Sequence, residues 1–247
     1  MRLNRFALVC AAVLLCCPRQ VAAFDQLCDS AFEDCRTPLL NLIKAETVAI
    51  DVGMWFMEDA RFSIELIKRK QAGVPVRILM DPRSNVQHPN QPTILQTLVD
   101  AGIPMRKRTA SGIEHWKIMI FQGQGKFYFG SANFSEDAFI FGSVGGPYVN
   151  YVDETIWYSD NVSLLQSLMR RFDDAWISSS YAWYANQTPT LERRYPLYTV
   201  NPELNVPPGQ DFIDRTAARI NAENTGIDAM MYRIDDERAT VAMINAK

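Results

Sequence analysis

The feature that most constrains this 247-residue chain is an alternation of short apolar strands with amphipathic helices. Glycine and proline interrupt the segments, and the helical ones carry apolar residues three and four positions apart. The pattern predicts strands at 47–56, 76–80 and 104–108 and helices at 37–45, 60–71, 92–101 and 161–178. Alternating strands and helices form crossover units. The sequence therefore predicts an α/β fold with a mixed, largely parallel sheet that helices flank on both faces.

A hairpin interrupts this alternation at residues 115–133. An apolar strand at 118–121 is followed by a turn with two glycines and by a return strand at 126–129. Side chains two positions apart on a strand share a face, so His115 and Lys117 should project together.

The return strand should bring Ser131 and Asn133 beside His115 and Lys117. An imidazole, an ammonium, a hydroxyl and an amide then form one cluster. This chemistry suits a phosphoryl group, because it offers one nucleophile and several donors for anionic oxygens. The alternative interpretation is a surface hairpin with an incidental histidine.

The spacing of these residues resembles the signature of the phospholipase D superfamily, His-x-Lys-x4-Asp followed by Gly-Ser-x-Asn. The matching residues are His115, Lys117, Gly130, Ser131 and Asn133. Two features depart from the signature. Gln122 stands at the position of the aspartate, where it keeps hydrogen-bonding capacity without the charge, and the gap to Gly-Ser is one residue longer.

The resemblance implies a mechanism without metal or cofactor, in which one histidine attacks phosphorus and a second protonates the leaving alcohol and then activates water. His115 takes one of these two roles, and the sequence leaves open which. Lys117, Ser131 and Asn133 are the implied phosphate binders, with packing beneath the histidine as an alternative role for Ser131.

An acidic residue on the next strand orients the catalytic histidine in the proteins that this sequence resembles. The predicted strand at 148–158 carries two adjacent carboxylates, Asp153 and Glu154. Neighbours on a strand face opposite sides, so only one can serve. Asp153 fits the surrounding pattern slightly better.

The last part of the chain repeats an early part at a constant offset of 177 residues. The matching pairs are Ala45 with Ala222, Glu46 with Glu223, Ile50 with Ile227, Asp51 with Asp228, Met54 with Met231, Asp59 with Asp236, Arg61 with Arg238, Ile67 with Ile244 and Lys70 with Lys247. An ungapped register with charged identities indicates duplication. We expect a helix at 212–223, a strand at 225–233 and a helix at 235–247.

The predicted organisation is therefore a first phospholipase D-like domain at 24–178, a connector at 179–208 and the truncated start of a second such domain at 209–247. The connector contains five prolines and shows no clean periodicity. The resemblance implies two domains that share one active site. The second half comes either from a missing C-terminal region, which the repeat favours, or from a dimer partner, and a monomer of this chain should have little turnover.

Residues 1–23 have the composition of a secretory signal peptide. Arg2 and Arg5 precede an apolar run at 6–17 that is short for a membrane span, and small residues follow at 21–23. We therefore expect a secreted or periplasmic protein. Removing this segment takes away three arginines and no acid, which changes the formal charge from −3 to −6.

Cleavage would leave Cys28 and Cys35 as the remaining cysteines. An even pair in an oxidising compartment predicts a disulfide, with two reduced thiols as the alternative. His88 and His115 are the only histidines in the sequence, so a Cys/His zinc site is poorly supported.

These features predict an exported phospholipase D-like phosphodiesterase that hydrolyses phospholipid headgroup esters. The acidic charge and the aromatic residues Phe134, Phe139, Phe141 and Tyr148 fit a lipid better than a polyanion. One alternative is a secreted nuclease of the same superfamily, which would bind nucleic acid with steep salt dependence. The other is a non-catalytic module that binds phosphate or lipid.

Overall fold

The computed structural model describes residues 24–30, 32–88, 90–139, 154–205, 212–229, 231, 234 and 236–246. The predicted signal peptide at 1–23 lies outside these residues, as do Asp153, Phe141 and Tyr148. None of the helices in the described ranges is long and apolar enough to cross a membrane.

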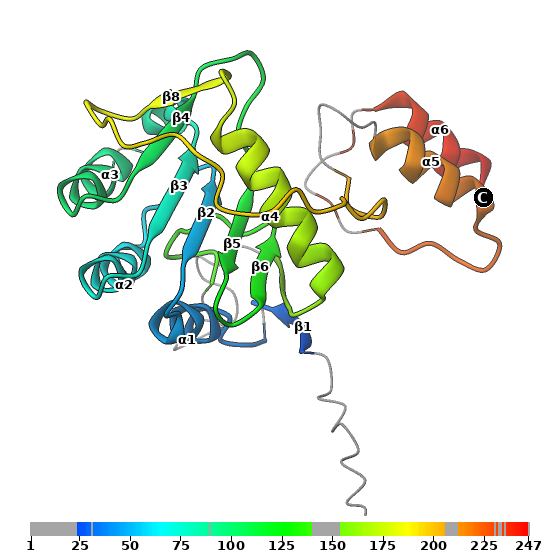
Figure 1. The fold of residues 1–247 in the computed structure, drawn as a ribbon. Helices are drawn as coiled ribbons and strands as arrows, with labels where there is room; N and C mark the ends of the chain where they lie inside the picture. Colours follow the sequence, from blue (N-terminus) through cyan, green and yellow to red (C-terminus); the bar gives the residue numbers. More distant parts are fainter. Residues whose placement is uncertain are drawn as a thin grey trace, which may run out of the picture.

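The described chain is built on one eight-stranded sheet with the order β1-β7-β6-β5-β2-β3-β4-β8 (Figure 1). Its strands are β1 Asp25–Asp29, β2 Ile50–Met54, β3 Val76–Met80, β4 Met105–Arg108, β5 Lys117–Phe121, β6 Lys126–Gly130, β7 Thr155–Ser159 and β8 Tyr181–Trp183. The predicted mixed sheet is confirmed, but it is mostly antiparallel, since only β2–β3 and β3–β4 pair in parallel. One helix connects β2 to β3 and another connects β3 to β4, and these crossover connections make the two pairs parallel. The turn at 122–125, which joins β5 to β6, is too short for a parallel connection.

Helices cover both faces of the sheet, as predicted (Figure 1). The helices are α1 Arg36–Ala45, α2 Ala60–Gln71, α3 Gln91–Asp100, α4 Val162–Trp176, α5 Phe212–Ala222 and α6 Glu237–Asn245. α1, α2 and α3 bury Leu39, Phe62 and Leu95 in the core on one face. α4 buries Leu168 and Phe172 in the core on the other.

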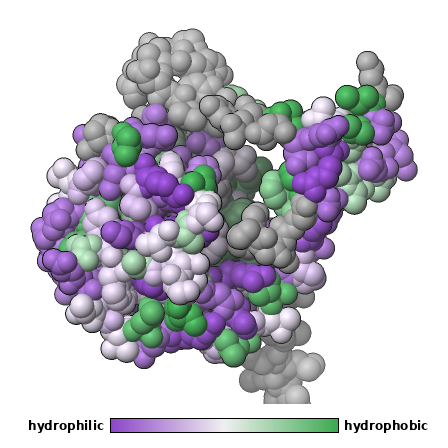
Figure 2. All heavy atoms as spheres, turned by 90° about the horizontal axis from the view of Figure 1, so that it is seen from above, coloured by the Kyte–Doolittle hydropathy of each residue, from purple (hydrophilic) through white to green (hydrophobic). Residues whose placement is uncertain are grey.

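Strand β5 lies near the middle of the sheet and is buried on both faces. Met119 and Phe121 join the core under α1–α3, whereas Ile118 and Ile120 join the core under α4. A strand buried on both sides needs a continuous apolar run, which β5 has. The face seen in Figure 2 is mainly hydrophilic, with hydrophobic residues in small separate groups.

The disulfide between Cys28 and Cys35 links β1 to the start of α1, with the two Cα atoms 5.9 Å apart. This Cα separation is usual for a disulfide. The bridge fixes the N-terminal edge strand to the helical layer.

The segment predicted as a connector contributes to the sheet and to a buried network. Its first residues form β8, which pairs antiparallel with β4. Further on, Arg194 and Tyr195 donate backbone N–H groups to Asp173 of α4. A three-residue strand is too short to show a periodicity, so the sequence pattern gave no sign of β8.

Helices α5 and α6 pack side by side, apart from the sheet (Figure 1). The offset of 177 maps the end of α1 onto the end of α5. Glu46 follows α1, and its Oε1 accepts hydrogen bonds from the next three backbone N–H groups, those of Thr47, Val48 and Ala49. Glu223 follows α5 and makes the same three bonds with Asn224, Thr225 and Gly226.

The start of α6 repeats the start of α2 in the same register. Asp59 accepts from the backbone N–H and the guanidinium of Arg61, and Asp236 accepts from the same groups of Arg238. The strand predicted at 225–233 is not formed by the described residues of that range. β2, its counterpart, pairs with β3 and β5, and the described tail offers no neighbouring strand.

A buried charge network joins the sheet to α4. The guanidinium of Arg77 on β3 donates to Asp51 on β2 and to Asp173 on α4, each at 2.8 Å. Arg194 and the Tyr195 hydroxyl also bind Asp51, at 2.7 and 2.6 Å. Asp51 and Asp173 are fully buried. The network therefore ties two strands, α4 and the segment after β8 together.

Replacing Arg77 with methionine should lower the free energy of unfolding by about 3 kcal/mol or more, because two buried carboxylates lose their shared cation. Denaturant unfolding at neutral pH measures the change. The control Lys68→Met breaks an exposed ion pair with Glu65 and should cost less than about 1 kcal/mol. A similarly small loss in Arg77→Met would contradict the role given to the network.

Candidate active site

The candidate site begins where the chain enters β5. His115 is exposed just before the strand, whereas Lys117 is the first residue of β5 and only 4% exposed. The Lys117 Nζ donates to the His115 carbonyl oxygen at 3.0 Å. The Trp55 ring lies 5.5 Å from the imidazole, between ring centroids. The chain thus holds the ammonium next to the histidine.

The glycine of the Gly-Ser-x-Asn motif, Gly130, is required by the close approach of β6 to β7. A Cβ atom on Gly130 would lie 2.3 Å from the carbonyl oxygen of Thr155, so β6 and β7 approach too closely for a side chain there. The Ser131 hydroxyl accepts from the Thr155 N–H at 2.9 Å. This hydrogen bond joins Ser131 to the start of β7. Ser131 therefore has a structural contact in addition to its predicted phosphate-binding role.

Asn133 has the opposite character, because its side-chain Oδ1 is buried without a hydrogen-bond partner among the described residues. Buried polar atoms are nearly always paired in folded proteins. An amide carries both donors and acceptors, so it can serve a bound group at this position.

The other predicted site residues fall in different places. Glu154 immediately precedes β7, and its charge acts on Lys117, whereas Asp153 lies outside the described residues. Gln122 lies in the hairpin turn, at the end of β5 opposite to His115. Gln122 lies five positions along the chain from Lys117, which corresponds to about 16 Å in an extended strand. Its substitution for aspartate therefore affects the turn and not the cluster.

Burial and neighbouring charges adjust the two key groups. Partial desolvation of the imidazole and the charge of Lys117 lower the pKa of His115, against the opposing charge of Asp81, and this favours the neutral imidazole. Burial also lowers the pKa of Lys117 to about 8, although Glu154 and Glu114 act in the other direction. At neutral pH the cluster therefore combines a neutral imidazole with an ammonium.

Two buried acids near the histidine were missed by the sequence analysis. Asp81 follows β3 and accepts a hydrogen bond from the backbone N–H of Glu114 at 2.8 Å. Glu114 directly precedes His115 and accepts a hydrogen bond from the Tyr181 hydroxyl. Burial raises the pKa of Glu114 to about 7. The signal was the Asp-Pro-Arg sequence, which directly follows the buried strand β3 and begins the loop that leads to α3.

His88, the second histidine, lies in the same loop and stacks on Phe56 with 3.4 Å between ring centroids. Its Nδ1 lies 3.2 Å from Glu58. Within the described ranges no group of three or more histidine, cysteine, aspartate or glutamate side chains is arranged to hold a metal ion.

The fold and the site together define a class of protein. A mixed α/β sheet presents an imidazole, a buried ammonium and an amide with an unpaired oxygen at the ends of its β5–β6 hairpin, and these groups can bind and attack a phosphoryl group. A family model described as "Cardiolipin synthase, PLD-like domain" matches residues 39–176, more than half of the chain. The chain belongs to the phospholipase D superfamily, and the resemblance seen in the sequence is confirmed.

Solved structures agree with this fold. A phospholipase D family member, Nuc from Salmonella typhimurium, is similar with a TM-score of 0.54 and 20% identity, over 66% of this chain and 98% of Nuc. NucT from Helicobacter pylori is similar with a TM-score of 0.53 and 15% identity, over 66% of this chain and 99% of NucT. A search of curated protein sequences gave no match. About two thirds of this chain thus corresponds to nearly the whole of either solved chain.

The raised pKa of Glu114 makes stability depend on pH. Its ordinary value is 4.5, so between pH 4.5 and about 7 the folded chain binds more protons than the unfolded chain. Its stabilising contribution is complete below pH 4.5 and is lost as the pH rises through about 7.

Glu114→Gln removes this titration and keeps an acceptor for Tyr181. We expect the variant to gain stability relative to the wild type as the pH rises from 4.5 to 7, by up to about 3 kcal/mol. Urea unfolding at several pH values measures the difference. Parallel pH profiles for the two proteins would show that Glu114 does not titrate in this window.

Proposed function

We propose that this protein is an exported phospholipase D-like phosphodiesterase that hydrolyses phospholipid headgroup esters through a phosphohistidine at His115. The carrying observation is the pairing of His115 with the buried ammonium of Lys117, whose Nζ binds the histidine's own carbonyl. The lowered pKa of the imidazole supports the nucleophilic role, because a nucleophile must be unprotonated whereas a general acid must carry a proton.

The proposed reaction has two steps. An imidazole nitrogen of His115 attacks phosphorus, which forms an N–P bond and breaks the bond to the headgroup oxygen. Water then attacks the phosphohistidine and releases the phosphorylated product. Lys117 and Asn133 would hold the non-bridging oxygens as the charge redistributes.

A second histidine is needed to protonate the leaving alcohol in this scheme. The repeat between 45–70 and 222–247 supports a second phospholipase D-like half that completes the site, in the same chain or in a second copy. The hydrogen bonds of Glu46 and Glu223 agree bond for bond, which strengthens the duplication. This chain as a monomer should therefore have little turnover.

The proposal of export is supported by the composition of residues 1–23 and by the Cys28–Cys35 disulfide. Disulfides persist mainly in oxidising compartments such as the periplasm and the extracellular space. The preference for lipid over nucleic acid is supported by the acidic charge of the chain.

Trapping the intermediate tests the proposed chemistry. After incubation with a short-chain phosphatidylserine and an acid-free quench, mass spectrometry should find a phosphatidyl adduct on His115. His115→Asn should lose both the adduct and hydrolysis, the latter by at least about 10³-fold. His88→Asn is the control and should keep both. An unmodified His115 together with full hydrolysis would contradict the proposal.

Lys117 makes substrate binding depend on pH. Because the pKa of Lys117 is about 8, its charge is lost as the pH rises above that value. The affinity for dimethyl phosphate, a diester with one charge throughout this range, should fall by roughly tenfold per pH unit above 8. Lys117→Arg keeps its charge and should bind equally well at pH 7 and pH 9. Titration calorimetry measures both, and an identical decline in the variant would exclude Lys117 as the cause.

A further inference from the structure

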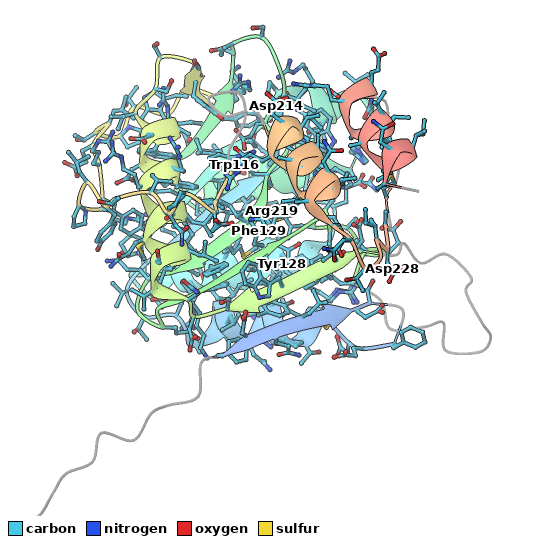
Figure 3. All side chains as sticks on the ribbon, turned by 90° about the vertical axis from the view of Figure 1, so that its right-hand side faces the viewer. Trp116, Tyr128, Phe129, Asp214, Arg219 and Asp228 are labelled. Atoms are coloured by element: carbon cyan, nitrogen blue, oxygen red, sulfur yellow. A yellow bond between two sulfur atoms is a disulfide. The ribbon has the colours of Figure 1, made fainter. Side chains whose placement is uncertain are left out.

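A small cavity lies beside the candidate site on the α4 side of the hairpin. Its volume is about 190 Å³, and its lining includes His115 and Lys117. Apolar walls come from Trp116, Phe129 and Leu168, the first two of which are labelled in Figure 3. Ligand pockets for drug-sized molecules measure roughly 300–1,000 Å³. This cavity is therefore smaller than such pockets, which suits one small group of a substrate such as a headgroup.

Two polar side chains in the lining of this cavity lack partners. The Nε of Arg171 and both amide atoms of Asn205 are buried without hydrogen bonds among the described residues. An unpaired buried donor or acceptor costs about 1–3 kcal/mol. A ligand that supplied oxygens to Arg171 and Asn205 would remove this cost.

The surroundings of Arg171 set it apart from its neighbour on α4. Arg170 pairs with Asp174 at 3.0 Å. In the described part of the chain, Arg171 has no carboxylate within ion-pair distance. Among the described residues, the cavity lining contains Arg171 and Lys117 and no acidic residue. The positive charge of Arg171 is thus available to bind an anion in the cavity.

This charge distribution discriminates between headgroups. A quaternary ammonium would gain from contact with the Trp116 and Phe129 rings. It would also be placed beside two cations in a partly desolvated cavity, where like charges repel more strongly than in water. A carboxylate or a second phosphate finds the reverse situation, because both cations attract it.

We propose that Arg171 and Asn205 form a subsite for the alcohol part of the substrate and select headgroups that carry an anionic, oxygen-rich group. Arg171 provides the charge and Asn205 the directional hydrogen bonds. The inference rests on the proposed function for the position of the phosphodiester at His115 and Lys117. It adds the chemical class of the leaving group, an anionic headgroup.

Two soluble diesters that differ only in the headgroup test this subsite. Glycerophosphoserine carries a carboxylate, and glycerophosphocholine carries a quaternary ammonium. The wild-type chain should bind glycerophosphoserine at least tenfold more tightly than glycerophosphocholine by titration calorimetry. Arg171→Met should remove most of this preference, and Asn205→Leu should weaken it.

Arg170→Met is the matched control, since it removes a neighbouring arginine that already has an acidic partner. It should keep the preference for glycerophosphoserine. Thermal unfolding of each variant shows that it is folded. If Arg171→Met denatures, Arg171→Lys replaces it, and this variant should keep the preference for the anion while binding it more weakly, because an ammonium lacks the fork of donors.

The outcomes separate the subsite from the proposed function. A preference that Arg171→Met abolishes, without an adduct on His115 from either diester, supports the subsite and counts against the enzymatic proposal. Hydrolysis with an unchanged preference in Arg171→Met overturns the subsite and leaves the enzyme. Tighter binding of a thymidine dinucleotide than of glycerophosphoserine, also dependent on Arg171, would overturn the assignment to a lipid headgroup.

Discussion

The β5–β6 hairpin depends on one fully buried carboxylate, that of Glu46. Its Oε1 accepts from the N–H of Gly123 at 2.9 Å, while the same atom holds the turn after α1. Its Oε2 accepts from the N–H of Gln124 at 3.3 Å. A buried carboxylate is tolerated only where donors replace its lost hydration. The loop before β2 and the hairpin turn therefore share one acceptor, which fixes the position of the hairpin relative to β2.

The two ends of β5 have different roles, because Glu46 holds the turn end and the candidate site lies at the other end. At the turn end, Gln122 needs no charge, because Glu46 already supplies the carboxylate that the backbone N–H groups require. At the other end, the close approach of Gly130 to Thr155 brings the start of β7, and with it Glu154, toward Lys117. The departure from the superfamily signature thus lies in the hairpin turn that Glu46 holds, whereas His115, Lys117 and Asn133 at the other end match the signature.

Local sequence patterns predicted the elements better than their arrangement. The helices and the crossover strands have the expected positions because their periodicity is a local property. The predominance of antiparallel pairs depends on β1, β7 and β8, which are short edge or near-edge strands paired with distant parts of the chain. In the site, His115, Lys117 and Asn133 were found by spacing. Glu114, Asp81, Arg171 and Asn205 were not, since burial and missing partners are properties of tertiary packing.

Several arginines of this protein have an aspartate partner, whereas two cations beside the histidine have none among the residues that the structure describes. Arg77, Arg83 and Arg170 each lie against an aspartate, which offsets the cost of holding a guanidinium out of water. Lys117 binds a carbonyl oxygen, and Arg171 leaves a buried Nε unpaired. Both line the same cavity, next to the histidine. Lys117 and Arg171 thus place positive charge on the lining of one cavity beside the histidine, where an anionic substrate would need it. The stability lost there is the expected signature of a binding site.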